Sequence, residues 1–281
     1  MKLDNRYKLN NGIQIPIIGY GTWRLPNTLE TAQSVAFAIK QGYRLIDTAS
    51  IYQNQEMVGK GIKDSGVDRK ELFITSKVWN TDQGYESTIK AFNKTIKQLG
   101  VSYLDLYLIH WPIPMGHLKD YQTLNVQTWK AMEELYQKGK IRAIGLSNFM
   151  PEHIDYLMKH TKIIPAIDQV ELHPGLPCNK LLQYAKKHNI IVESWGPLAS
   201  GKTLKDDQLQ TIANKYHKTV AQLCLRWAIQ QGIVPLPKSA HRERIIENSK
   251  IFDFTITPSD MKLIAKVNYP RYGGDPYKEA V

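Results

Sequence analysis

At 281 residues and 42% hydrophobic content, the chain can bury one large core, and no repeat or linker divides it, so we expect a single domain over residues 1–281. The formal net charge of +11 comes from basic residues scattered along helical segments, so we expect no nucleic-acid partner, although a basic mouth for an anionic cofactor or substrate stays compatible with it. Cys178 and Cys224 are too few for a disulfide framework, no signal-peptide core opens the chain, and no apolar run approaches the roughly 20 residues of a membrane span, which predicts a soluble cytoplasmic protein.

The chain opens with a predicted hairpin. In YKLNNGIQI, apolar positions alternate on either side of Asn10, Asn11 and Gly12, which is typical of two strands turned at Asn-Gly. We expect this hairpin to cap one end of the core.

Helical periodicity follows. One helix is indicated by apolar positions at Ala32, Val35, Ala36 and Ile39, behind an Asn27 cap with Glu30. A second runs from Val126 to Tyr136 and stops at Gly139. Near the end, one extra helix starts about Pro258, and the Pro-, Gly- and Tyr-rich tail after it could lie across the mouth of a barrel.

Between the helices lie eight short apolar runs: IIGYGTW, YRLIDTA, LFITSKVW, YLDLYLIHW, IRAIGLSN, PAIDQVEL, IIVESWGPL and IVPLPKS. Runs that are apolar on both faces are expected of parallel strands buried between layers. Eight of them joined by helices favour an α/β fold of the (β/α)8 TIM-barrel type. An open doubly wound sheet is disfavoured because Gly19-Tyr20-Gly21 lacks the third glycine of the dinucleotide fingerprint.

A polar or aromatic side chain closes each run. These residues are Thr22, Asp47, Lys77, His110, Asn148, Gln169, Trp195 and Lys238. Because the carboxyl ends of barrel strands meet at one rim, we expect them to share an active site.

Four of the polar residues near this rim suit proton donation to a carbonyl. A phenol titrates near pH 10, so we expect the ammonium of Lys77 to make Tyr52 more acidic, with Asp47 keeping Lys77 protonated. His110 can orient the carbonyl oxygen. Each residue also has a structural interpretation: Asp47 as a strand terminator, Tyr52 as a rim aromatic and His110 as a core histidine. The predicted role in proton donation therefore rests on the expected position of all four residues at one rim, and not on any one of them.

The sequence resembles the aldo-keto reductase superfamily, in particular its prokaryotic 2,5-diketo-D-gluconate reductase and glyoxal or methylglyoxal reductase type. The motifs are NNGIQIPIIGYGTW, GYRLIDTASIYQNQEMVGKGI, LFITSKVWN, LDLYLIHWP, GKIRAIGLSNF, IDQVELHP and PKSAHRERIIEN. The resemblance implies a catalytic tetrad of Asp47, Tyr52, Lys77 and His110, with Tyr52 as general acid. It also implies a monomer.

The resemblance further implies an NADPH site. Ser147, Asn148 and Gln169 would bind the nicotinamide carboxamide, Trp195 would stack on the ring, and Gly196, Pro197 and Leu198 would pass over the pyrophosphate. Lys238, Ser239, Arg244, Glu247 and Asn248 would hold the 2′-phosphate and adenine, and Gly21, Thr22 and Asp47 complete the cofactor set. Gly196 replaces a serine common in the family, so one cofactor hydrogen bond would be missing.

For the substrate, the resemblance implies contacts with Trp23, Tyr52, Trp79, His110 and Trp111. The tail after Lys266 is shorter than in the steroid-acting relatives, which predicts a pocket open on that side. We therefore expect an oxidoreductase that reduces aldehydes and ketones with NADPH, over a broad range including small aldehydes, dicarbonyls and keto-sugars.

No metal is expected, since the histidines lack H-E-x-x-H or similar spacing, and His173 beside Pro174 suits a structural role. Two alternatives stay open. One is a regulatory module that binds NADPH but turns over slowly. The other is a barrel isomerase or lyase that uses Lys77 as a Schiff-base amine.

Overall fold

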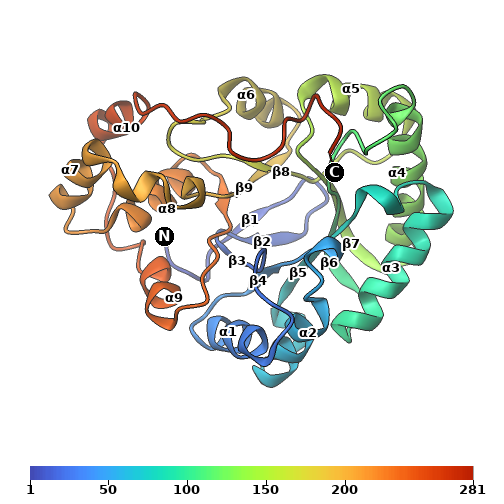
Figure 1. The fold of residues 1–281 in the computed structure, drawn as a ribbon, viewed down its shortest axis with the longest axis horizontal. Coiled ribbons are helices and arrows are strands. Elements are labelled where there is room, and N and C mark those ends of the chain that lie inside the picture. The colour runs from blue at the N-terminus through green and yellow to red at the C-terminus, as the bar shows by residue number, and fades with distance from the viewer. Residues whose placement is uncertain (281) are drawn as a thin grey trace.

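A computed structural model describes residues 1–280 and shows parallel strands enclosed by helices (Figure 1). Within these residues, an eight-stranded sheet has the order β10-β9-β8-β7-β6-β5-β4-β3, with all neighbours parallel. Its strands are β3 (Gly19–Gly21), β4 (Leu45–Asp47), β5 (Phe73–Val78), β6 (Leu104–Ile109), β7 (Ile141–Ser147), β8 (Ile167–Glu171), β9 (Ile191–Trp195) and β10 (Val234–Pro235). This is the TIM barrel that the sequence predicts.

The barrel closes between its first and last strands. The backbone N–H of Gly21, at the end of β3, donates to the carbonyl of Pro237, just beyond β10, at 3.0 Å. A side chain at Gly19 would collide with Leu236 and Leu45, so glycine is required for the two strands to approach this closely.

Helices surround the barrel: α1 (Leu29–Lys40), α2 (Gln55–Asp64), α3 (Tyr85–Leu99), α4 (Tyr121–Gln137), α5 (Pro151–His160), α6 (Asn179–Lys187), α7 (Asp207–Lys215), α8 (Val220–Gln230), α9 (Arg242–Ser249) and α10 (Pro258–Ile264). The predicted helices correspond to α1, α4 and α10. The predicted cap of the first is wrong by one residue, because Thr28 and not Asn27 precedes α1. Gly139 does end α4, with a φ of +67° that favours glycine.

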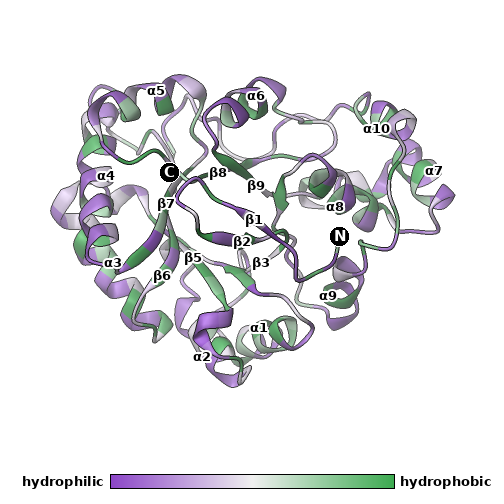
Figure 2. Cartoon of the chain, turned by 180° about the vertical axis from the view of Figure 1, so that it is seen from behind, coloured by the Kyte–Doolittle hydropathy of each residue, from purple (hydrophilic) through white to green (hydrophobic). Residues whose placement is uncertain are grey.

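The predicted hairpin is confirmed as β1 (Arg6–Lys8) paired antiparallel with β2 (Gln14–Pro16). It covers the amino-terminal ends of the strands: Asn10 donates to the carbonyl of Pro165, before β8, and Asn11 to that of Arg142, at the start of β7. Figure 2, from behind, shows β1 and β2 over the middle of the barrel. The opposite, carboxyl end of the strands stays available for a site.

Apolar side chains occupy two layers. Those between strands and helices form the larger core, and a smaller core inside the barrel joins Leu9 and Ile15 of the hairpin region to Leu45, Phe73 and Leu106. In Figure 2 the helices carry both hydrophilic and hydrophobic stretches, as expected of helices that have one face against the barrel and the other toward solvent. No helix among residues 1–280 is long and apolar enough to cross a membrane.

Candidate active site

A cavity of about 970 Å³ opens at the carboxyl ends of the strands. Of the residues singled out in the sequence, it is lined by Gly21, Trp23, Asp47, Tyr52, Trp79, His110, Trp111, Asn148, Gln169, Trp195, Gly196, Pro197, Leu198, Lys238, Ser239, Arg244, Glu247 and Asn248. The structure therefore gathers most of the predicted site residues around one space.

Three of the predicted residues lie behind this surface. Lys77 is 0% exposed and reaches the site through Tyr52. Thr22 and Ser147 are buried, and their hydroxyls donate to the backbone carbonyls of Asp47 and Gln169 at 2.8 Å each. Thr22 and Ser147 therefore do not line the cavity, and a contact of either residue with a cofactor stays a prediction.

An ion pair lies beneath the cavity floor. The ammonium of Lys77 donates to both carboxylate oxygens of Asp47, at 2.8 and 2.7 Å, and to the carbonyl of Thr48 at 3.0 Å. Burial alone would lower the pKa of Lys77, but the charges of Asp47 and Tyr52 and the hydrogen bonds to them together outweigh it, and the pKa is raised. Lys77 therefore stays an ammonium at neutral pH.

Tyr52 lies in the 3₁₀ turn Ser50–Tyr52 directly after β4, which brings its hydroxyl within 3.3 Å of the Lys77 ammonium. Burial nevertheless raises the pKa of Tyr52, and Lys77 offsets only part of that rise. The expectation that the neighbouring ammonium makes this phenol more acidic than usual is therefore wrong for the free protein. What the ammonium can do is stabilise the phenolate once the proton has left.

His110 completes the group. Its ring meets those of Tyr52 and Trp79 edge to face, with centroids 5.8 and 5.0 Å apart. Burial first, and then the charge of Lys77, lower the pKa of His110 well below its usual range. The imidazole is therefore neutral at physiological pH, and it can donate one hydrogen bond without carrying charge.

Beside the tetrad, Trp195 is fixed by Asn148. The indole N–H donates to Asn148 Oδ1 at 2.8 Å, while Asn148 Nδ2 donates to the carbonyl of His110 at 2.9 Å. Asn148 has a φ of +63°, a backbone conformation that asparagine tolerates better than most residues. Its amide thus orients an aromatic wall of the cavity.

Arginine and lysine side chains line part of the cavity. Lys238 follows β10, Arg244 lies in the first turns of α9, and Arg24 packs over the ring of Trp23 at 4.2 Å. Burial and then the charge of Arg24 lower the pKa of Lys238, as expected for clustered cations. Such a cluster can bind phosphate groups. Arg24 was missed from the sequence, where its place directly after Trp23 was the available signal.

The C-terminal tail forms another part of the wall through Tyr272, Gly273 and Gly274, which the sequence did not single out. The expectation of a pocket open on that side is therefore wrong. In Figure 1 the tail runs from α10 across the ends of β8 and β9. A side chain at Gly196 would overlap the hydroxyl of Tyr272, so the space of the missing serine is filled by the tail.

Buried Glu171, at the end of β8, anchors this tail. It accepts hydrogen bonds from the backbone N–H groups of Tyr272 and Gly273, both at 3.0 Å, and pairs with His173 at 3.2 Å. His173 is fully buried and also contacts the carbonyl of Pro174 at 2.8 Å, which agrees with the structural role expected for it.

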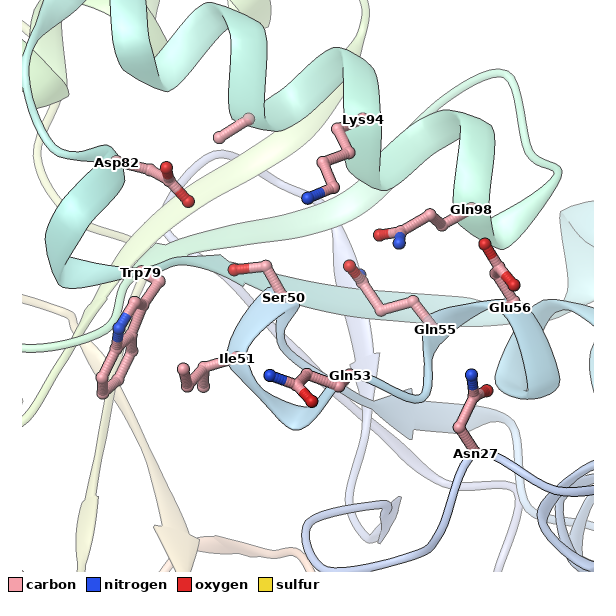
Figure 3. A pocket seen from close by; sticks show the side chains of 11 residues that line it. Asn27, Ser50, Ile51, Gln53, Gln55, Glu56, Trp79, Asp82, Lys94 and Gln98 are labelled. Atoms are coloured by element: carbon pink, nitrogen blue, oxygen red, sulfur yellow. The ribbon is translucent and has the colours of Figure 1, made fainter.

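A smaller cavity of about 270 Å³ adjoins the first, since Ile51 and Trp79 line both. Figure 3 shows its mostly polar side chains, which include Asp82 and Lys94. Of these two cavities, the larger one is lined by Asp47, Tyr52 and His110 of the predicted tetrad, so it is the candidate site. Within residues 1–280, no three His, Cys, Asp or Glu side chains are grouped as metal ligands.

Comparison with known proteins agrees with this fold and identifies the family. The profile described as "Aldo/keto reductase family" matches residues 17–269. Glyoxal reductase of Bacillus subtilis (strain 168) is 50% identical over 275 residues, which cover 98% of this chain and 97% of that protein. The 9,11-endoperoxide prostaglandin H2 reductase of Trypanosoma cruzi (strain CL Brener) is 48% identical over 276 residues, covering 97% and 95%.

Solved structures give the same result. The crystal structure of a Bombyx mori aldo-keto reductase in complex with NADP superposes with a TM-score of 0.87 at 35% identity and covers 95% of this chain and 94% of that one. An aldo-keto reductase from Brucella melitensis gives a TM-score of 0.88 at 46% identity, covering 93% and 98%. The chain therefore belongs to the aldo-keto reductase family, and it is an oxidoreductase of that family.

Proposed function

We propose that this protein reduces aldehydes and ketones to alcohols with NADPH, and that Tyr52 is the general acid. The observation that carries the proposal is the contact chain from Asp47 through Lys77 to the Tyr52 hydroxyl, which lies on the cavity beside His110. The related proteins named glyoxal reductase and prostaglandin H2 reductase support it, as does the bound NADP of the Bombyx mori structure.

The cavity fits such a cofactor. It offers the indole of Trp195 as a flat apolar face, the amide of Gln169, and the cations Arg24, Lys238 and Arg244. An anionic dinucleotide with an extra phosphate needs an aromatic surface at one end and positive charge at the other. When bound, NADPH supplies the hydride that reaches the carbonyl carbon.

Residues of this chain then donate the proton to the carbonyl oxygen. Tyr52 transfers its phenolic proton to the carbonyl oxygen as that oxygen gains negative charge, and the Lys77 ammonium stabilises the phenolate left behind. Neutral His110 donates a hydrogen bond to the same oxygen and orients it. A high pKa of Tyr52 is compatible with this role, since the acceptor is an alkoxide-like oxygen that is far more basic than a phenolate.

The Schiff-base alternative loses support from the state of Lys77. Nucleophilic attack needs a free amine, whereas this ammonium is held by Asp47, Thr48 and Tyr52, and its pKa is raised. A substrate panel tests the remaining proposal. It contains methylglyoxal, glyoxal, aromatic aldehydes and keto-sugars, because the aromatic walls of Trp23, Trp79 and Trp111 suit a broad range.

The decisive variant is Tyr52→Phe. It should lose about 10²- to 10⁴-fold in carbonyl reduction, followed by the absorbance of NADPH, yet retain NADPH affinity, because the phenol acts on the carbonyl oxygen. Near-normal turnover of Tyr52→Phe would refute the assignment. Wild-type protein that binds NADPH but reduces no member of the panel would favour the regulatory module.

A further inference from the structure

A carboxyl group with no role in the chemistry above lies under the cavity floor. Glu193 is on β9, directly beside Gln169 on β8 in the register of the two strands, and it is 0% exposed. Gln169 Nε2 donates to Glu193 Oε2 at 2.8 Å and to Asp47 Oδ2 at 2.9 Å. Glu193 thus belongs to the same hydrogen-bonded group as the Asp47–Lys77 pair.

These two bonds determine which way the Gln169 amide faces. An amide nitrogen carries two N–H donors, and both are used, one by each carboxyl group. A flipped amide would place its carbonyl oxygen against the Asp47 carboxylate, where two acceptors would repel. The side chain therefore presents Oε1 as its remaining polar atom, and Gln169 lines the cavity.

A neutral carboxyl group at Glu193 is well suited to orienting the Gln169 amide. Burial raises its pKa to about 8, and the charge of Asp47 contributes to that rise, while the Gln169 bond and Lys77 oppose it. At neutral pH the protonated carboxyl accepts from Gln169 without adding a second buried negative charge that would compete with Asp47 for Lys77. Its Oε1 has no partner within residues 1–280, so Gln169 is its single anchor.

We propose that Glu193 is a positioning residue, which holds the Gln169 amide with its carbonyl oxygen turned to the nicotinamide end of the cofactor cavity. This inference rests on the proposed function, since the oxygen would accept the N–H of the nicotinamide carboxamide. Glu193 itself stays below the floor and touches neither cofactor nor substrate.

Two substitutions by side chains of similar volume distinguish a role in positioning Gln169 from a role in packing alone. Glu193→Met keeps the volume but removes the acceptor, whereas Glu193→Gln keeps an acceptor for Gln169 Nε2. Binding is measured by quenching of tryptophan fluorescence, with NADPH and with adenosine 2′,5′-bisphosphate, a fragment that lacks the nicotinamide. The fragment also reports that each variant is folded.

We expect Glu193→Met to bind NADPH about five- to tenfold more weakly, the value of one hydrogen bond, with unchanged affinity for the fragment. Glu193→Gln should restore NADPH affinity to within about twofold. Unchanged NADPH affinity in Glu193→Met, or equal loss for both ligands, would overturn the positioning role alone. Wild-type protein that fails to bind NADPH would sink the proposed function, and the inference with it.

Discussion

Replacement of Lys77 by methionine separates the stabilising from the catalytic role of the buried ion pair. Asp47 is 4% exposed and accepts three side-chain hydrogen bonds, two from Lys77 at 2.8 and 2.7 Å and one from Gln169 at 2.9 Å. Lys77→Met removes two of the three and leaves a buried carboxylate without its cation. Breaking a buried pair in this way typically costs about 3–5 kcal/mol of unfolding free energy.

The double variant Asp47→Asn/Lys77→Met is the matched control. The double variant removes the unpaired buried carboxylate of Asp47. The oxygen of the introduced amide can still accept a hydrogen bond from Gln169, so the double variant should recover most of the lost stability. Urea denaturation followed by circular dichroism gives the free energy of unfolding, and NADPH absorbance with methylglyoxal gives the activity. Both variants should lack activity, because neither has an ammonium beside Tyr52.

The reasoning fails if Lys77→Met loses less than about 1 kcal/mol, since the charge left behind would then be solvated. It also fails if the double variant is no more stable than Lys77→Met. Retained turnover in either variant would show that Tyr52 does not need the ammonium.

Three further predictions follow from other parts of the structure. Asp168 is buried, and desolvation raises its pKa well above its usual range, although the backbone N–H of Phe149 opposes the rise. The folded protein should therefore lose stability as pH rises from about 4 through that pKa. Asp168→Asn should flatten this loss in denaturation measured from pH 5 to 9, and an unchanged pH dependence would contradict it. Gly196→Ser should lower the melting temperature, because the φ of +61° is unfavourable for serine and because the new side chain would overlap Tyr272. Adding Tyr272→Ala should restore part of this loss. An unchanged melting temperature of the single variant would mean that the tail moves aside freely. Arg244→Ala should weaken NADPH about tenfold while leaving NADH affinity nearly unchanged, and equal losses in the two titrations would place the 2′-phosphate elsewhere.

Strand periodicity and chain order predict the barrel and the residues that close its strands, because the (β/α)8 fold sends each strand's carboxyl end to one rim. The remaining candidate residues, such as Arg244 and Asn248, came from the family resemblance. Which side chain at the end of a run faces the cavity is harder to predict. Successive strand residues point to opposite faces, so a shift of one position decides between lining and burial. Ser147 and Asn148 illustrate this: the first binds the backbone of β8, and the second lines the cavity.

The acidity of Tyr52 was misjudged for a related reason. The sequence shows which charged residues adjoin the rim, but it does not show how much water each group loses. Desolvation is the largest influence on the pKa of Tyr52, of His110 and of Glu193 alike, and it depends on the packed structure. The pairing of Lys77 with Asp47 was predictable, whereas the net direction of the phenol's pKa was not.

The position of the C-terminal tail is a third feature that was hard to predict from the sequence, and this tail affects which substrates fit. Glu171 holds the segment through the backbone N–H groups of Tyr272 and Gly273, which any residue except proline provides. The side-chain signals of this anchor are few: Arg271 pairs with Glu171 at 3.7 Å, and Gly273 and Gly274 leave room for Trp195 and Trp111. A side chain at Gly273 or Gly274 would collide with Trp195 or Trp111, so of positions 272–274 only 272 can change its side chain while the segment stays in place. Since Tyr272 lines the cavity, a change at this position would alter which carbonyl compounds fit without disturbing Asp47, Lys77 or Tyr52.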